Sequence, residues 1–306
     1  MLLTAINRGV SWDLDMGPLD LVNLTPLMAR TSGRAEIKIG LIDGPVALDH
    51  SDLAVHNIHQ VPGKQSGACS TASSLACMHG TFVAGMLMAK RGSAAPAICP
   101  GCTLLVRPIF AESSSANGDM PSAKPEELAT AIVETIAAGA RVINLSAAVS
   151  QPSANGEREL EEALNHAARR NVIVVVAAGN QGSVGSSVLT RHPWSIPVAA
   201  CDLQARMMAA SNLGSSIGRH GLTAPGENIT SLATNGKPQT FGGTSAAVPF
   251  VVGTIALLWS EFSTASAAQI KLAVTQAGAE RRKAIAPPLL NAWSAFEAMS
   301  SALRTQ

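Results

Sequence analysis

Residues 171–180 read NVIVVVAAGN, and this short stretch decides the class of fold. Valine and isoleucine fill it without the alternation of polar and apolar side chains that a half-buried strand shows. A continuous apolar run of this length predicts a strand covered on both faces, as strands are in a parallel sheet between two layers of helices. The run ends in Gly179 and Asn180, which predict a turn directly after the strand.

Similar apolar runs lie on both sides of this stretch, and helical patterns separate them. The predicted strands are 36–43, 103–110, 140–146, 171–180 and 195–201, and the predicted helices are 81–90, 125–139 and 156–170. Strands that alternate with helices form right-handed crossovers and a parallel sheet. We therefore expect an α/β fold, a three-layer sandwich whose mostly parallel central sheet is flanked by helices. In such sheets ligands bind beyond the carboxyl ends of the strands.

The chain changes character after residue 202. Short pieces broken by glycine, proline and asparagine predict hairpins and turns as far as the segment GGTSAAVP at 242–249. The run 245–262 is apolar on nearly all sides and predicts a buried helix. Two further helices are expected near 266–277 and 291–303.

Composition narrows the kinds of partner that the chain can have. Its 306 residues are 47% hydrophobic and 14% charged, which is typical of a globular protein. The 22 lysines and arginines nearly balance the 21 aspartates and glutamates, so nothing in the net charge favours nucleic acid or an anionic membrane. The N-terminal residues lack the apolar core of a signal peptide and include Asp13, Asp15 and Asp20, so we expect a cytoplasmic protein.

Residues of types that can act in catalysis lie at the ends of predicted strands and the starts of predicted helices, where this class of fold binds ligands. Asp43 ends the strand IGLID, and Asn180 ends the strand 171–180. His79 lies at a helix start in HGTFVAG, and Ser245 lies at another helix start after Gly-Gly-Thr. A helix N-terminus offers free backbone N–H groups that can hold an oxyanion, and a carboxylate can orient an imidazole. Each residue alone has an ordinary explanation, such as a helix cap or a turn, but together they satisfy the requirements of nucleophilic acyl transfer.

The motifs that contain these residues resemble those of the subtilisin-like serine proteases. They are IGLIDGPV, HGTFVAG, AAGN and GGTSAAVPFVVG, in the subtilisin order, and the similarity covers about residues 20–262. The resemblance implies a serine endopeptidase with Ser245 as nucleophile, His79 as general base and acid, and Asp43 as the residue that orients the imidazole. It also implies an oxyanion hole made by Asn180 and the backbone N–H of Ser245.

The same resemblance assigns the substrate cleft. The residues implied to contact the substrate are Ser146, Ala147, Ala148, Gly179 and Arg191. The first three would pair with the substrate backbone as an added strand. Counting on from the oxyanion asparagine places the pocket floor near Arg191 or His192, where a cation would favour an acidic substrate side chain. A solvent-facing arginine is the alternative interpretation.

Segments such as IGLIDGPV, ACMHGTFVAG and ICPGCTLLVRPIF are similar to those of the cyanobactin maturation proteases, which cut precursor peptides of ribosomally made natural products. The expected activity is therefore cleavage of a ribosomal precursor peptide inside the cell. Asp43 and His79 are 36 residues apart, which leaves little room for the helical lid of related macrocyclising domains. The alternative is a catalytically silent subtilisin-like module that binds peptides. We expect residues 1–19 to form an N-terminal extension, residues 20–306 to form the peptidase domain, and the chain to be a monomer.

No cofactor is expected. Asp52 in DHSDL matches a frequent calcium ligand of the family, but the loop KRGSAAPAICPGC lacks the oxygen-rich run that such a site needs, so calcium is not favoured. Cysteine spacing leaves more alternatives open. The segment CPGC has the spacing of a zinc knuckle, and the candidate ligands are Cys69, Cys77, Cys99 and Cys102. Disulfides and free structural thiols are favoured over zinc for these four, and Cys201 is interpreted as a buried core thiol.

Overall fold

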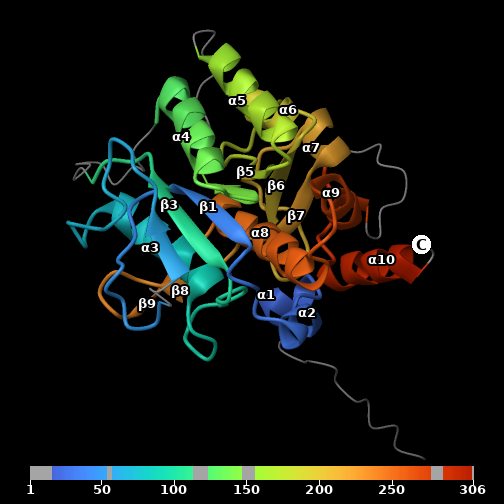
Figure 1. The fold of residues 1–306 in the computed structure, drawn as a ribbon, viewed down its shortest axis with the longest axis horizontal. Coiled ribbons are helices and arrows are strands. Elements are labelled where there is room, and N and C mark those ends of the chain that lie inside the picture. The colour runs from blue at the N-terminus through green and yellow to red at the C-terminus, as the bar shows by residue number, and fades with distance from the viewer. Residues whose placement is uncertain (1–15, 54–56, 113–122, 147–155, 277–284, 305–306) are drawn as a thin grey trace, which may run out of the picture.

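The computed structural model describes residues 16–53, 57–112, 123–146, 156–276 and 285–304, and its centre is a parallel sheet (Figure 1). The seven-stranded sheet has the order β2-β3-β1-β4-β5-β6-β7, and every neighbouring pair is parallel. The strands are β1 (Lys38–Asp43), β2 (Ile58–Gln60), β3 (Thr103–Pro108), β4 (Val142–Leu145), β5 (Ile173–Ala177), β6 (Ser195–Cys201) and β7 (Leu222–Pro225). The predicted α/β class is confirmed.

Helices cover both faces of this sheet, so the fold has three layers. On one face lie α4 (Pro125–Ala137) and α5 (Glu157–Arg169), and on the other lie α3 (Leu75–Met88) and α8 (Thr244–Glu261). Each face packs its own apolar cluster, which is why β5 is buried on both sides. Gly40 in β1 allows close packing of α4, because a Cβ there would lie 2.2 Å from Thr135 Cγ2.

Helix α8 runs through the centre of the molecule and contacts β4 to β7. Among the described residues it is the one helix long and apolar enough to cross a membrane by length and composition, but 89% of its 18-residue window is buried inside the fold. A helix that is apolar on all sides has no face suited to water, so it is buried on all sides. The predicted buried helix at 245–262 is therefore the core helix of the domain.

The remaining elements surround this core. They are α1 (Pro18–Leu21), α2 (Thr25–Arg30), α6 (Val188–Arg191), α7 (Ser215–His220), α9 (Ala267–Gln276), α10 (Ala292–Arg304) and the antiparallel hairpin β8 (Ile229–Leu232) with β9 (Pro238–Phe241). The expected boundary after residue 19 falls within α1. Leu19 packs against the main apolar cluster, so the described end of the expected extension is part of the folded body.

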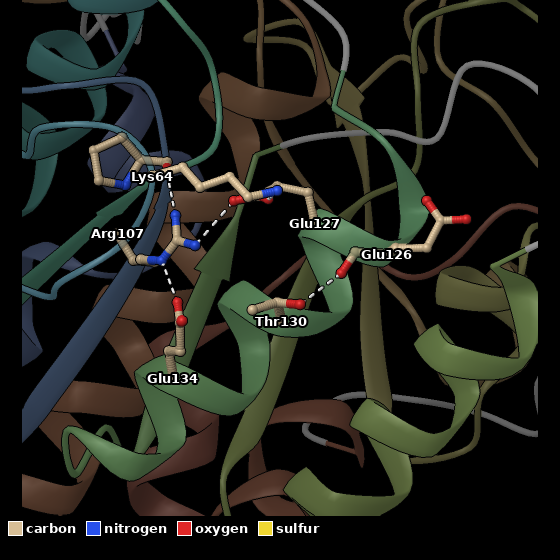
Figure 2. A network of polar contacts seen from close by, with 7 residues as sticks. Lys64, Arg107, Glu126, Glu127, Thr130 and Glu134 are labelled. Atoms are coloured by element: carbon tan, nitrogen blue, oxygen red, sulfur yellow. Dashed lines mark hydrogen bonds and ion pairs between the residues drawn. The ribbon is translucent and has the colours of Figure 1, made fainter.

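A buried cation joins α4 to the sheet (Figure 2). The side chain of Arg107 in β3 is 1% exposed, and it bonds Glu134 Oε2 at 2.6 Å and Glu127 Oε1 at 3.0 Å, both from α4. Lys64 contacts the other oxygen of Glu127 at 2.8 Å. Burial raises the pKa of Glu127, but the two cations outweigh it and hold that pKa below its ordinary value. The charge of the buried guanidinium is thus paired with two carboxylates.

Candidate active site

The carboxylate of Asp43 lies at the carboxyl end of β1 and is completely buried. Its Oδ1 accepts a hydrogen bond from the backbone N–H of Gly44 at 2.6 Å and lies 2.7 Å from His79 Nδ1. Its second oxygen, Oδ2, has no hydrogen-bond partner among the described residues. The hydrogen bond from Gly44 therefore holds the carboxylate in an orientation that faces the imidazole of His79.

His79 lies in the second turn of α3, and two glycines let that helix approach β1. A Cβ on Gly44 would lie 1.9 Å from the Ala76 carbonyl oxygen, and a Cβ on Gly80 would lie 2.3 Å from the Pro45 carbonyl oxygen. Both distances are far below a van der Waals contact. Only glycine at these positions allows the backbone contact that places the imidazole against Asp43.

The pKa of His79 lies above its ordinary value of 6.5. Burial on its own lowers this pKa, but the negative charge of Asp43 and the hydrogen bond to it raise the pKa by more. The pairing thus favours the imidazolium form relative to a free histidine. An imidazole held in this way is suited to accept a proton from a neighbouring hydroxyl.

Asn180 follows β5, and Thr244 fixes its side-chain amide. Asn180 Oδ1 accepts from the backbone N–H of Thr244 at 2.9 Å and from its hydroxyl at 3.0 Å. The same hydroxyl accepts from the backbone N–H of Gly179 at 3.2 Å. Because both partners of Asn180 are donors, its carbonyl oxygen must face Thr244 and its Nδ2 is left to donate elsewhere. At Gly243, φ is 107° and a Cβ would lie 2.9 Å from Asn180 Nδ2, so glycine is required there.

Ser245 is the second residue of α8, where the helix N-terminus provides positive potential. Its Oγ donates to the Ser146 carbonyl oxygen at 2.9 Å. Ser146 follows β4, and its own hydroxyl accepts from Asn144 Nδ2 at 2.7 Å. No hydrogen bond joins Ser245 to His79 in the described part of the chain. The structure thus brings Ser245 to the end of β4, while His79 lies against the end of β1.

The predicted substrate residues have different outcomes. Ala147 and Ala148 lie outside the described residues. Arg191 ends α6 with a 47% exposed side chain and is paired with Glu157 at 3.0 Å. His192 bonds Asn165 at 3.3 Å, and burial lowers its pKa, with a smaller opposing effect from Glu161. Arg191 thus has an ion-pair partner and His192 has a lowered pKa, and a pocket floor at these residues stays a prediction.

A disulfide bond ends at Cys77, two residues before His79 in helix α3. It joins Cys69 to Cys77, with a Cα–Cα separation of 5.6 Å. Beyond it, Glu112 accepts hydrogen bonds from the backbone N–H groups of Ser70 and Thr71, and its carboxylate lies within 4.8 Å of both sulfurs. The loop that carries Cys69 is therefore attached both to α3 and to the segment after β3.

The candidate cysteines differ in their bonding. Cys99 and Cys102 are buried free thiols that are hydrogen-bonded to each other, beside Arg91 and Ser260, and Cys201 is also buried and free. Because Cys69 and Cys77 are bonded to each other, the four candidate sulfurs do not converge on one tetrahedral site. Hydrogen bonding to Cys99 lowers the pKa of Cys102, against the effect of burial.

The backbone of Asp52, the residue that matches a calcium ligand, is bonded to protein groups. The Lys90 ammonium donates to the carbonyl oxygen of Ser51, next to Asp52. The carbonyl oxygen of Asp52 accepts from the Lys90 backbone N–H at 2.7 Å, and its own N–H donates to His50 Nδ1 at 3.0 Å. These bonds use backbone atoms of Ser51 and Asp52, not the Asp52 carboxylate that would bind calcium, so the expectation that calcium is not bound stays a prediction.

Sequence reasoning missed three residues that touch the site. Thr244 orients Asn180, and its signal was its place directly before the serine. Phe241 has its ring centroid 6.0 Å from that of His79, and Gln239 reaches the carbonyl oxygen of Met78. Both lie in β9, whose short sequence PQTF carries no catalytic motif.

The fold and this group of side chains are those of a serine peptidase. Comparison with known proteins identifies the family: residues 34–288 match the model of the subtilase family, Peptidase S8, and the chain belongs to that family of serine endopeptidases. It is 28% identical over 258 residues to subtilisin DY of Bacillus licheniformis, covering 83% of this chain and 87% of that protein. Against subtilisin E of Bacillus subtilis strain 168 it is 27% identical over 78% of this chain and spans 59% of that relative's length.

Solved structures agree with this assignment. A mutant of the protease domain of PatA has a TM-score of 0.80 and 28% identity, covering 88% of this chain and 97% of that one. The prenylagaramide maturation protease PagA has a TM-score of 0.76 and 26% identity, covering 90% and 98%. A lanthipeptide protease, at 21% identity and a TM-score of 0.75, shares the fold.

Proposed function

We propose that Ser245 attacks the scissile carbonyl of a peptide, that His79 accepts the serine proton and returns it to the leaving amine, and that Asp43 holds the imidazole. The 2.7 Å contact between Asp43 Oδ1 and His79 Nδ1 is the observation that carries the proposal. Because Nδ1 faces the carboxylate, Nε2 is the nitrogen available to the serine. A buried carboxylate also stabilises the imidazolium that forms during the reaction.

Reaction in this arrangement requires the Ser245 side chain to turn. In the described state its hydroxyl donates to Ser146. A change of χ1 breaks that single bond and directs Oγ towards the imidazole. Catalytic hydrogen bonds are often absent or long in peptidases without substrate and form in the Michaelis complex. A substrate strand that takes up the Ser146 backbone would favour this rotation.

The developing oxyanion would be held by Asn180 Nδ2 and the backbone N–H of Ser245. Thr244 supports this role because its two donors fix the Asn180 carbonyl oxygen away from the substrate. Pre-oriented donors of this kind stabilise a transition state without reorganisation during the reaction.

The proposed substrate is an extended segment of a ribosomal precursor peptide, lying beside Ser146, Ala147 and Ala148. The support is similarity to PatA and PagA, which are maturation proteases of patellamide and prenylagaramide. We further propose cleavage rather than cyclisation. Among residues 44–53 and 57–74, the described residues between Asp43 and α3, there is no α-helix that could serve as a lid.

A catalytically silent peptide-binding module is the competing function, and the hydrogen bond between Ser245 and Ser146 is the observation that favours it. In that case the hydroxyl would stay bonded to Ser146 when peptide binds. Binding would then proceed without turnover.

The cytoplasmic setting and the monomeric state complete the proposal. The Cys69–Cys77 disulfide argues against a cytoplasmic setting, because cytosolic thiols are kept reduced. Alkylation of free thiols at the moment of lysis, followed by mass spectrometry, measures the state of this pair. Light scattering of the purified chain measures its mass in solution.

Incubation with a library of unmodified peptides, followed by mass spectrometry of the products, tests the function. We expect cleavage by the wild type and none by Ser245→Ala. Peptide binding by the wild type with no new termini would establish the silent module instead. Equal cleavage by both proteins would exclude Ser245 as the nucleophile.

A further inference from the structure

Strand β9 connects the two halves of the candidate site. It ends at Phe241, close before Ser245 in the chain, and its side chains reach the first turns of α3, which carries His79. The Nε2 of Gln239 in β9 donates to the Met78 carbonyl oxygen at 2.8 Å and to the Leu232 carbonyl oxygen at 2.9 Å. One amide therefore joins the strand before the serine, the partner strand β8 and the peptide group directly before the histidine.

The orientation of this amide follows from its partners. Both partners are carbonyl oxygens, so the nitrogen of Gln239 must face them. Its Oε1 is then buried, and no hydrogen-bond partner for it exists among the described residues. An unpaired buried acceptor costs about 1–3 kcal/mol. An aliphatic side chain would avoid that cost, so the donor is what distinguishes glutamine at this position.

A second contact from the same strand reaches the same histidine. Side chains alternate along β9, with Pro238 and Thr240 exposed while Gln239 and Phe241 face inward. The ring of Phe241 lies 6.0 Å from that of His79 and packs edge-on at 5.1 Å against Phe82 of the same helix. The inward side of β9 thus contacts α3 immediately before and at His79.

We propose that Gln239 is a positioning residue that sets the spacing between His79 and Ser245. This inference rests on the proposed function, because spacing matters only if the two residues exchange a proton. No hydrogen bond joins these two side chains in the described residues, so their separation is fixed by the scaffold alone. An error of about 1 Å in such spacing can cost on the order of a hundredfold in turnover.

Three variants separate this role from simple stabilisation of the hairpin. Gln239→Glu keeps the shape and replaces the donor with an acceptor, and Gln239→Leu removes both polar atoms. Thr240→Val is the matched control, because Thr240 is exposed and bonds Thr230 at 3.0 Å on the opposite side of the same hairpin from Gln239. All are compared with the wild type for kcat, KM, the rate of inactivation by a fluorophosphonate, and the midpoint of thermal unfolding.

Both Gln239 variants are expected to lose about tenfold to a hundredfold in kcat and in fluorophosphonate inactivation rate, with KM within about threefold of the wild type. Thr240→Val is expected to keep both rates even where its unfolding midpoint falls. Assays run below the lowest midpoint of the set, so that every variant is folded.

Rates in Gln239→Glu and Gln239→Leu that match those of Thr240→Val would overturn the positioning role. A loss confined to KM would overturn it as well, because it would assign Gln239 to substrate binding. A wild type that neither cleaves peptide nor reacts with the fluorophosphonate would instead overturn the proposed function itself.

Discussion

The floor and the rim of the candidate site are built in different ways. The floor consists of Asp43, Asn180 and Ser245, which stand at the ends of strands and at the start of α8. The rim consists of the Cys69–Cys77 loop and β9. Strand ends and the start of α8 place the floor residues, and Thr244 orients Asn180, whereas a disulfide and the amide of Gln239 hold the rim.

The floor contains the groups that the proposed reaction requires, and the rim contains the additional contacts around His79. The floor places a carboxylate, an amide and a hydroxyl at the carboxyl edge of a parallel sheet, where any such sheet can bind a ligand. His79 contacts both regions: its imidazole bonds Asp43 of the floor and its ring lies near Phe241 of the rim. Changes to the floor should therefore cost far more activity than changes to the rim.

Removal of the Asp43 charge should have the largest effect. Asp43→Asn is expected to lower kcat about 10⁴-fold, because the imidazole loses its orientation and the imidazolium its counter-charge. The measurement is kcat and kcat/KM across a pH series. Full activity in this variant would contradict the assignment of Asp43.

The same series tests the pKa of His79. The neutral imidazole is the active form, and Asp43 raises its pKa above 6.5, so wild-type kcat/KM should fall as the pH drops through a value above 6.5. In Asp43→Asn burial remains and the charge is gone, so the acid limb should move to lower pH. An unchanged limb would mean that another group controls it.

Loss of the oxyanion donor should come next. Asn180→Leu is expected to lower kcat by about 10²–10³-fold with little change in KM, because the donor acts on charge that develops only in the transition state. Steady-state kinetics with one peptide measure both values. A loss in KM alone would assign Asn180 to ground-state binding.

The contact between α3 and β1 should have an intermediate effect. Gly80→Ala puts a Cβ 2.3 Å from the Pro45 carbonyl oxygen, so α3 must shift and His79 with it. We expect at least a tenfold loss of kcat and about 1–3 kcal/mol of stability. Gly185→Ala is the control, because a Cβ there meets nothing within 4 Å. Equal behaviour of the two variants would show that the contact adjusts at no cost.

Opening the disulfide should have the smallest effect. The double variant Cys69→Ser, Cys77→Ala loses one link of the rim while Glu112 still holds the loop, so kcat should fall by less than about tenfold. Cys201→Ala is the control, because it removes a buried cysteine that is in no disulfide. Burial, with a smaller effect of Asp202, raises the pKa of that thiol to about 11. A loss as large as that of Asn180→Leu would show that the disulfide is as important for activity as the residues of the floor.

Much of the floor could be predicted from the sequence. Long apolar runs such as 171–180 gave the central strands, and the residues that follow them fell at one edge of the sheet, as parallel topology demands. The edge strand β2 and the short β7 were missed, because three or four residues beside glycine and proline carry too little pattern.

The rim could not be predicted for a different reason. Cysteine spacing does not select partners, so the pairing of Cys69 with Cys77 and the free thiols at Cys99 and Cys102 emerged only from the fold. The link from Gln239 to Met78 joins residues 161 apart in the chain. The hydrogen bond from Ser245 to Ser146 is a rotamer choice, which no local sequence encodes.

Labelling with a fluorophosphonate tests most directly whether His79 and Ser245 act as one site. The reagent forms a bond to an activated serine oxygen and loses fluoride, and mass spectrometry locates the adduct. The account predicts rapid modification of Ser245 in the wild type and a loss of several orders of magnitude in that rate in His79→Ala. Equal labelling of both proteins, or none of the wild type, would contradict it.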